Sequence, residues 1–266
     1  MRNIEVIALI LAGSALTGFL AGMLGIGGGM IMVPLLLWIM ELQSINTPHA
    51  QHVAVGTSFL VMVFTSFSSA LAQQRKQAVR WPVVRYMAPA ILLGTLLGAA
   101  VARYLPHRGL QLFFILYALV FGVQTLLRYT PAPTRQLPGR AGMSAAGGII
   151  GLVSSWVGIG GGSMSVPFML YCNVPVHHAV GTAAALGWPI AVAGAVGYLL
   201  SGWSVEQLPA YTLGFWYVPL AAIMAVTTVL FAPLGVRVAH WLPPAQLKRA
   251  VGMLMLVIAA QMLYQW

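Results

Sequence analysis

Eight long apolar runs constrain the fold of this 266-residue chain more than any other feature. An α-helix needs about 20 residues to cross a hydrocarbon core about 30 Å thick, and each run is near that length. Only 6% of the residues are charged, which excludes an ordinary soluble domain. The sequence therefore predicts an all-α polytopic membrane protein. The runs are 4–21, 52–72, 83–102, 110–127, 141–157, 180–200, 212–233 and 248–263.

Two shorter apolar runs, 30–42 and 163–172, each follow a cluster of glycines. Either run falls short of a full crossing unless the glycines before it also lie at membrane depth. Counting both as segments gives about ten.

A repeated motif divides the chain into two halves. Residues 25–34 read GIGGGMIMVP and residues 158–167 read GIGGGSMSVP, with seven of ten positions identical. HVAVGTS follows the first copy from His52, and HHAVGTA follows the second from His177. Repeats of this kind in a membrane protein are typical of transporters. We predict a first repeat at 1–130, a basic Pro-rich linker at 131–140 and a second repeat at 141–266.

The cation distribution tests the topology of these repeats. If both short runs cross and the N-terminus is outside, ten of the 13 Lys and Arg fall in cytoplasmic loops and three outside. If the short runs re-enter, the best orientation gives eight against five. Positive charge concentrates on the cytoplasmic side, so we expect two inverted five-segment repeats. The ten are Arg75, Lys76, Arg80, Arg85, Arg128, Arg135, Arg140, Arg237, Lys248 and Arg249; the three are Arg2, Arg103 and Arg108.

Each glycine motif is expected to break a helix. Glycines permit positive φ and leave backbone N–H groups unobstructed, while Pro34 and Pro167 each remove a helical donor. Open backbone at membrane depth is tolerated only where protein buries it or where it lines a cavity. The two breaks are therefore expected to meet near the midplane. The N-terminus of a half-helix favours an anion, although small residues at these positions could instead serve close helix packing.

Polar groups in the following helices are further candidates. The hydroxyls of Thr57 and Thr182 could donate to an oxyanion, or could bond to their own helix. His52 and His177 lie at helix starts, where they could titrate or simply be solvated. The sequence holds no Asp, and its three Glu lie near segment ends, which disfavours a carboxylate relay and a cationic substrate. No metal site, cofactor or catalytic residue is indicated, and nucleic acid is not an expected partner. Oligomeric state is not predicted.

The doubled GxGGGxxxVP, followed in each half by HxAVGT, resembles the TauE/SafE family of sulfite exporters and related permeases. The resemblance covers nearly the whole chain. It implies a multi-pass permease of the bacterial inner (plasma) membrane, not an enzyme, that moves small sulfur-containing anions such as sulfite or organosulfonates. The site residues that it implies are Gly25, Gly27, Gly28, Gly29, Pro34, His52, Gly56 and Thr57 in the first half, and Gly158, Gly160, Gly161, Gly162, Pro167, His177, Gly181 and Thr182 in the second. Ser163 and Ser165 are further candidates, from the difference between the two copies.

The two copies differ where Met30 and Met32 are replaced by Ser163 and Ser165. The second copy is therefore expected to supply more hydrogen bonds to the substrate. Our interpretation is an alternating-access transporter in which paired broken helices bind a small anion. Two alternatives remain: a permease for another solute, such as a carboxylate, and a membrane scaffold that transports nothing.

Overall fold

The computed structural model describes residues 2–25, 27–45, 47–127, 136–241 and 244–264. Ten helices and one short hairpin make up this part of the chain, which confirms the all-helical prediction. The elements are α1 (Arg2–Leu24), α2 (Gly29–Leu42), α3 (Ala50–Arg75), α4 (Trp81–Ala102), α5 (His107–Leu126), α6 (Arg140–Val157), α7 (Gly162–Tyr171), α8 (Val176–Gly202), β1 (Thr212–Leu213), β2 (Trp216–Tyr217), α9 (Val218–Ala239) and α10 (Pro244–Tyr264).

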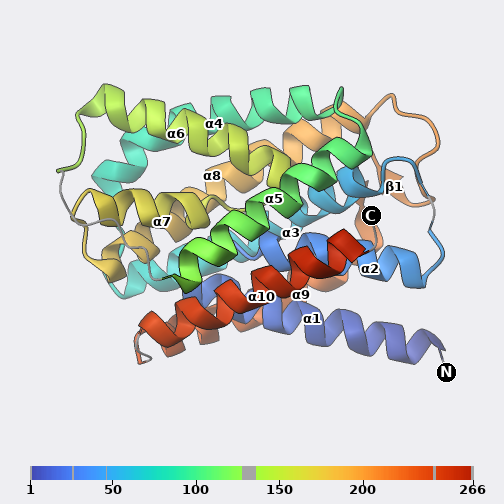
Figure 1. The fold of residues 1–266 in the computed structure, drawn as a ribbon, viewed down its shortest axis with the longest axis horizontal. Helices are drawn as coiled ribbons and strands as arrows, with labels where there is room; N and C mark the ends of the chain where they lie inside the picture. Colours follow the sequence, from blue (N-terminus) through green and yellow to red (C-terminus); the bar gives the residue numbers. More distant parts are fainter. Residues whose placement is uncertain (1, 26, 46, 128–135, 242–243, 265–266) are drawn as a thin grey trace.

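The helices lie roughly along the long axis of the molecule, with both chain termini at one end (Figure 1). That end, which we call the terminus end, also carries the α2–α3 connection and the hairpin. The opposite end, where α5 ends and α6 begins, is the linker end. The side-chain hydroxyl of Thr47 donates to the carbonyl of Gln207 at the terminus end, and His178 bonds to the carbonyl of Ala78 at the linker end.

Six helices are long and apolar enough to cross a membrane among the residues described: α1, α3, α4, α5, α8 and α9. Of these, α3 and α8 are the most deeply buried, and they are the helices that begin with the two HxAVGT motifs. The short helices α2 and α7 have 14 and 10 residues. At 1.5 Å per residue, they extend for only about 21 and 15 Å, roughly half a bilayer each.

One predicted crossing is displaced along the sequence. The apolar run at 212–233 was expected to be one helix, but its first six residues form the hairpin β1–β2, in which Thr212 pairs with Tyr217. Gly214 supplies the positive φ of the turn (54°), and Pro219 lies in the first turn of α9. Proline favours a helix start, so α9 begins at Val218 and continues to Ala239.

The halves predicted from the repeat share one core in the structure. The most extensive helix contacts are α4 with α6, α1 with α9 and α3 with α8, and each pair joins a helix from one half to a helix from the other. The boundaries of the repeats stay a prediction, and residues 131–135 of the predicted linker lie outside the described residues. What the packing adds is that neither half buries its central helix without the other.

Glycines make the α4–α6 contact possible, and they provide a matched test of it. A Cβ on Gly94 would overlap the carbonyl oxygen of Gly148, whereas a Cβ on Gly148 would have only the carbonyl oxygen of Ala90 nearby, at 3.8 Å. We expect Gly94→Ala to lower the free energy of unfolding by about 1–3 kcal/mol, because the helices must separate. Gly148→Ala should instead be neutral or stabilise by up to about 1 kcal/mol, through helix propensity.

The measurement is the midpoint of thermal unfolding in detergent for both variants and the parent protein. Equal midpoints for the two variants would contradict this description of the α4–α6 contact.

Candidate functional site

The two glycine motifs break the chain between helices, as the sequence predicts. The first separates α1 from α2, and the second separates α6 from α7. Gly28 and Gly161 are the N-cap residues of the two short helices and have left-handed φ values of 84° and 69°. Left-handed backbone strains most residues with a Cβ, so these positions favour glycine. Gly25, Gly27 and Gly158 also have positive φ.

The two glycine loops, residues 25–29 and 158–162, touch each other through their backbones. A Cβ on Gly29 would overlap the carbonyl oxygen of Gly158, and a Cβ on Gly27 would lie 2.9 Å from the Cα of Gly160. Because these contacts leave no room for a side chain, the absence of Cβ atoms is what lets the two loops meet.

The central helices fix the depth at which the loops meet. The first loop packs on Met62, whose sulfur and methyl carbon lie 2.8 and 2.9 Å from the Cβ positions of Gly29 and Gly27. In the second loop, the carbonyl oxygen of Gly160 lies 3.3 Å from the Cβ position of Gly187. Met62 and Gly187 are close to the middle of α3 and α8. The loops therefore meet about halfway along the molecule.

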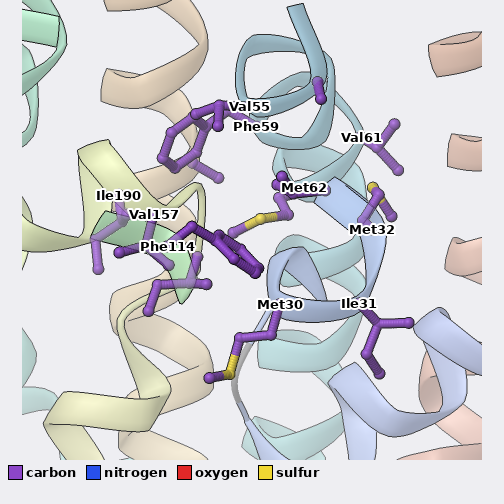
Figure 2. Close-up of a cluster of buried hydrophobic side chains, with 14 of the residues drawn as sticks. Met30, Ile31, Met32, Val55, Phe59, Val61, Met62, Phe114, Val157 and Ile190 are labelled. Atoms are coloured by element: carbon purple, nitrogen blue, oxygen red, sulfur yellow. The ribbon is translucent and has the colours of Figure 1, made fainter. Parts of the chain in front are cut away.

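Apolar groups surround the first loop. Thr17 and Ala21 of α1 and Val180 of α8 face it, together with Met62. The Thr17 hydroxyl donates to the carbonyl of Gly13 in its own helix, at 2.7 Å. Figure 2 shows Met30 and Met62 extending their thioethers toward the side of the core where Phe114, Val157 and Ile190 lie. The apolar core therefore reaches the first loop directly.

Hydroxyl groups lie among apolar side chains at the second loop, where Ile190 and Ile150 are nearest to the Cβ position of Gly161. Three hydroxyls in this region have no hydrogen-bond partner. Ser154, Ser165 and Ser66 are at most 1% exposed, and each has an unpartnered Oγ. The Ser154 hydroxyl lies 3.4 Å from the Cβ position of Gly161, and that of Ser66 lies 3.4 Å from the Cβ position of Gly187. Burying an unsatisfied hydroxyl costs free energy, so these groups require an explanation beyond packing.

The first turn of α7 adds backbone donors to the same place. The N–H groups of Met164 and Ser165 donate to the carbonyl of Gly161. Those of Gly162 and Ser163 have no acceptor among the described residues, as the start of a helix requires. The Ser163 hydroxyl shares a short hydrogen bond with the hydroxyl of Tyr117 in α5. This end of α7 carries partial positive charge and donors that could bind an anion.

The two threonines of the HxAVGT motifs bond across the two halves. Thr57 in the first half accepts the N–H of Tyr217, and Thr182 in the second accepts the N–H of Arg80, both at 2.9 Å. Tyr217 and Arg80 are the N-cap residues of α9 and α4. Gly56 and Gly181 allow the close approach, since a Cβ on either would lie 2.6–2.7 Å from the carbonyl of Phe215 or Ala78. The described contacts of these four residues are therefore structural, and their role in binding stays a prediction.

The structure places His52 and His177 at opposite ends of the molecule. His52 is 2% exposed, its Nε2 donates to the carbonyl of Ala102 at 3.0 Å, and its ring stacks on Phe215. His177 is exposed and stacks on His240, with ring centroids 5.3 Å apart. Partial burial lowers the pKa of His240, helped by the nearby His177 and Lys76. Neither predicted histidine contacts a glycine loop among the described interactions.

Pro34 and Pro167 lie inside α2 and α7. Each lacks an N–H, so the carbonyls four residues earlier, those of Met30 and Ser163, lose their helical donor. Pro34 also lines a cavity of about 340 Å³ toward the terminus end, together with His107 and Gln111.

Several residues that meet the loops belong to none of the sequence motifs. Ser58 donates to the carbonyl of Gly158 at 3.3 Å, and Met62, Ser66, Ser154 and Tyr117 lie beside the loops or their short helices. Single hydroxyls in long apolar helices carry no motif. The one signal for Ser66 in the sequence is its spacing from the other hydroxyl residues of α3.

These features define the class of protein, which is a polytopic membrane protein whose two halves meet at broken helices. The chain belongs to the TauE/SafE family, since the family model described as "Sulfite exporter TauE/SafE" matches residues 10–262. It is thus a member of a family of membrane transporters.

Curated relatives have names of the same kind. A "Probable membrane transporter protein" of Haemophilus influenzae is 31% identical over 96% of this chain and 97% of its own length. YunE of Bacillus subtilis, with the same description, is 26% identical over 76% of this chain and 82% of its own. A similarly described protein of Methanocaldococcus jannaschii is 22% identical over 93% and 92%. No solved structure matches the chain.

The cross-half threonine bonds give a stability prediction. Thr57→Val and Thr182→Val remove the acceptors for part-buried backbone N–H groups, so each should lower the free energy of unfolding by about 1–3 kcal/mol. Thr57→Ser should restore most of the loss. Thr227→Val is the control, because Thr227 is half-buried and its hydroxyl donates only to the carbonyl of Ile223 in its own helix. Thermal unfolding in detergent measures all four variants, and an unchanged midpoint for Thr57→Val would contradict the structural role.

Proposed function

We propose that this protein carries a small oxyanion, such as sulfite or an organosulfonate, across the membrane by alternating access. The observation that supports this most is the junction of the two glycine loops, where buried hydroxyls without partners face the start of α7. Family membership supports transport itself. The choice of anion rests on the chemistry of the junction.

The groups at the junction favour negative charge. Four groups there can donate hydrogen bonds: the backbone N–H groups of Gly162 and Ser163, and the hydroxyls of Ser154 and Ser165. The sequence has no Asp, and its three Glu are at positions 5, 41 and 206, near the ends of the helices or in a connection. A cation at the junction would therefore lack a counter-charge, whereas an oxyanion would satisfy the donors.

We further propose that the ten helices form two inverted sets of five. The termini lie at the same end, as an even number of segments requires, and the α2–α3 and α7–α8 connections lie at opposite ends (Figure 1). In this arrangement, α2 and α7 each traverse half of the bilayer and meet at the midplane through the glycine loops.

The charges orient this arrangement. Eight described cations belong to connections or helix ends at the linker end, and three belong to the terminus end. The eight are Arg75, Lys76, Arg80, Arg85, Arg140, Arg237, Lys248 and Arg249; the three are Arg2, Arg103 and Arg108. Arg128 and Arg135 lie outside the described residues. We propose that the linker end faces the cytoplasm and that the membrane is the bacterial inner membrane. The small anion and the lipid bilayer are the proposed partners.

Transport by matched serine variants tests the substrate and its site together. Purified protein in liposomes should take up labelled sulfite or a labelled small sulfonate. Ser154→Ala and Ser165→Ala should reduce uptake about tenfold or more in combination, if each hydroxyl contributes about 1 kcal/mol of binding. Both should leave thermal stability equal or higher, because the hydroxyls that they remove have no partner in the protein.

Ser155→Ala is the control for these variants. Ser155 is the neighbour of Ser154 in α6, but its hydroxyl donates to the carbonyl of Leu152 at 2.6 Å. It should transport like the parent protein. The proposal would be wrong if folded protein takes up none of a panel of inorganic oxyanions, sulfonates and carboxylates. Uptake of carboxylates alone would change the proposed substrate class to carboxylates.

Cysteine labelling tests the inverted arrangement. Ser44 and Asn173 are exposed, follow the short helices α2 and α7, and have similar left-handed φ values of 56° and 60°. In a Cys172→Ala background, Ser44→Cys should react with an impermeant thiol reagent from the outside, and Asn173→Cys from the cytoplasmic side. Labelling of both from the same side would exclude inverted repeats.

A further inference from the structure

The central helices α3 and α8 are equivalent by their HxAVGT motifs, but their second halves differ in chemistry. Beyond the glycine loops, α3 carries Ser66, Ser69 and Gln73. The equivalent positions in α8, 125 residues later, are Ala191, Gly194 and Tyr198. Because the helices run in opposite directions, the first set lies between the loops and the linker end, and the second set lies between the loops and the terminus end.

Ser66, Ser69 and Gln73 form a buried polar line. Each is 1% exposed, and the hydroxyl oxygens and the Oε1 atom of Gln73 have no hydrogen-bond partner. Spacings of three and four residues place them on one face of α3 over about 10 Å of helix. The Ser66 hydroxyl lies beside Gly187, and Gly187 also approaches the carbonyl oxygen of Gly160 in the second loop. The line therefore begins at the junction and ends near the cationic connection that contains Lys76.

The opposite half is closed by aromatic rings. A Cβ on Gly194 would lie 2.5 Å from the ring of Phe59, and Phe59 packs on Tyr198 with ring centroids 5.8 Å apart. Phe215, which is 1% exposed, contacts Tyr198 at 6.2 Å and stacks on His52 at 5.2 Å. Phe215 lies in the turn between β1 and β2, so the hairpin inserts this ring among α3 and α8.

The corresponding residue at the linker end is small. Gly56 packs on the carbonyl of Phe215, and Gly181 packs in the same way on the carbonyl of Ala78. Ala78 thus occupies the place of Phe215 in the other half, and its side chain carries no ring. The ring of Phe215 therefore closes the terminus end between the central helices, and Ala78 supplies no such ring at the linker end.

We propose that Ser66, Ser69 and Gln73 line the cytoplasmic half of the transport route, and that Phe215 closes the outer half in this conformation. The proposal rests on the proposed function, and it adds the residues of the route and the side from which the junction is reached. Three polar groups without partners in an apolar bundle are costly, and water or a passing anion would satisfy them. In the outer half, the amide of Gln51 and the Nδ1 atom of His52 are also buried without partners, at the start of α3, and there the ring of Phe215 stacks on His52.

Cysteine accessibility tests the route without any substrate. In a Cys172→Ala background, Ser66→Cys, Ser69→Cys and Gln73→Cys are exposed to an impermeant thiol reagent in inside-out and right-side-out vesicles. All three should react from the cytoplasmic side, about tenfold or more faster than a buried control. They are only 1% exposed in this conformation, but opening of the route during transport would expose them to water, and thiolate reactivity follows exposure. Thr65→Cys is that control, since Thr65 is fully buried and bonds to the Thr228 hydroxyl at 2.6 Å.

Phe215→Ala tests the closure. In this variant, Ala191→Cys should become reactive from the outside, while it stays unreactive when Phe215 is present. Retained cytoplasmic labelling of Ser66→Cys in the same Phe215→Ala protein shows that the bundle is intact.

Two results would overturn the proposal: labelling of the three α3 cysteines no faster than Thr65→Cys, or faster labelling from the outside. Labelling as expected in a protein that carries no anion would remove the proposed function and keep the route. Anion uptake without labelling would remove the route alone.

Discussion

The backbone contact between the two glycine loops is the constraint on which the rest of this structure depends. A side chain on Gly29 would collide with the carbonyl of Gly158, so the loops can meet only because neither presents a Cβ there. Once they meet, the short helices α2 and α7 extend from the junction toward opposite ends of the molecule (Figure 1). The central helices α3 and α8 then hold the junction at mid-length.

Close approach enabled by glycine recurs where the two halves interlock. Gly56 and Gly181 bring the central helices against the chain that precedes α9 and α4, and Thr57 and Thr182 accept N–H groups there. Apolar side chains in a membrane gain little from leaving lipid for protein, so association relies on tight packing and on satisfied polar groups. The repeated motif therefore encodes the assembly of the halves as well as the break in each helix.

The two halves of the molecule have the same order of long and short helices but differ in chemistry. Serines replace methionines at the start of α7, the polar line of α3 has apolar or aromatic counterparts in α8, and Ala78 stands where the other half has Phe215. Repeated backbone supplies a pair of equivalent paths to the junction. Side chains then make one path polar and the other closed, which gives the transporter two sides that are not interchangeable.

The sequence alone determined the membrane class, the helix count and the positions of both breaks, because long apolar runs and glycine clusters act locally. It placed α2 and α7 within one or two residues, and among the described residues it missed the hairpin before α9, where β-turn chemistry interrupts an apolar run. Which groups meet at the junction was decided by the tertiary structure. Ser66, Ser154 and Phe215 lie far apart along the chain and share no motif, so only helix packing could bring them to the glycine loops or to the central helices that hold them. The same packing gave Thr57 and Thr182 their backbone partners, which no spacing in the sequence could reveal.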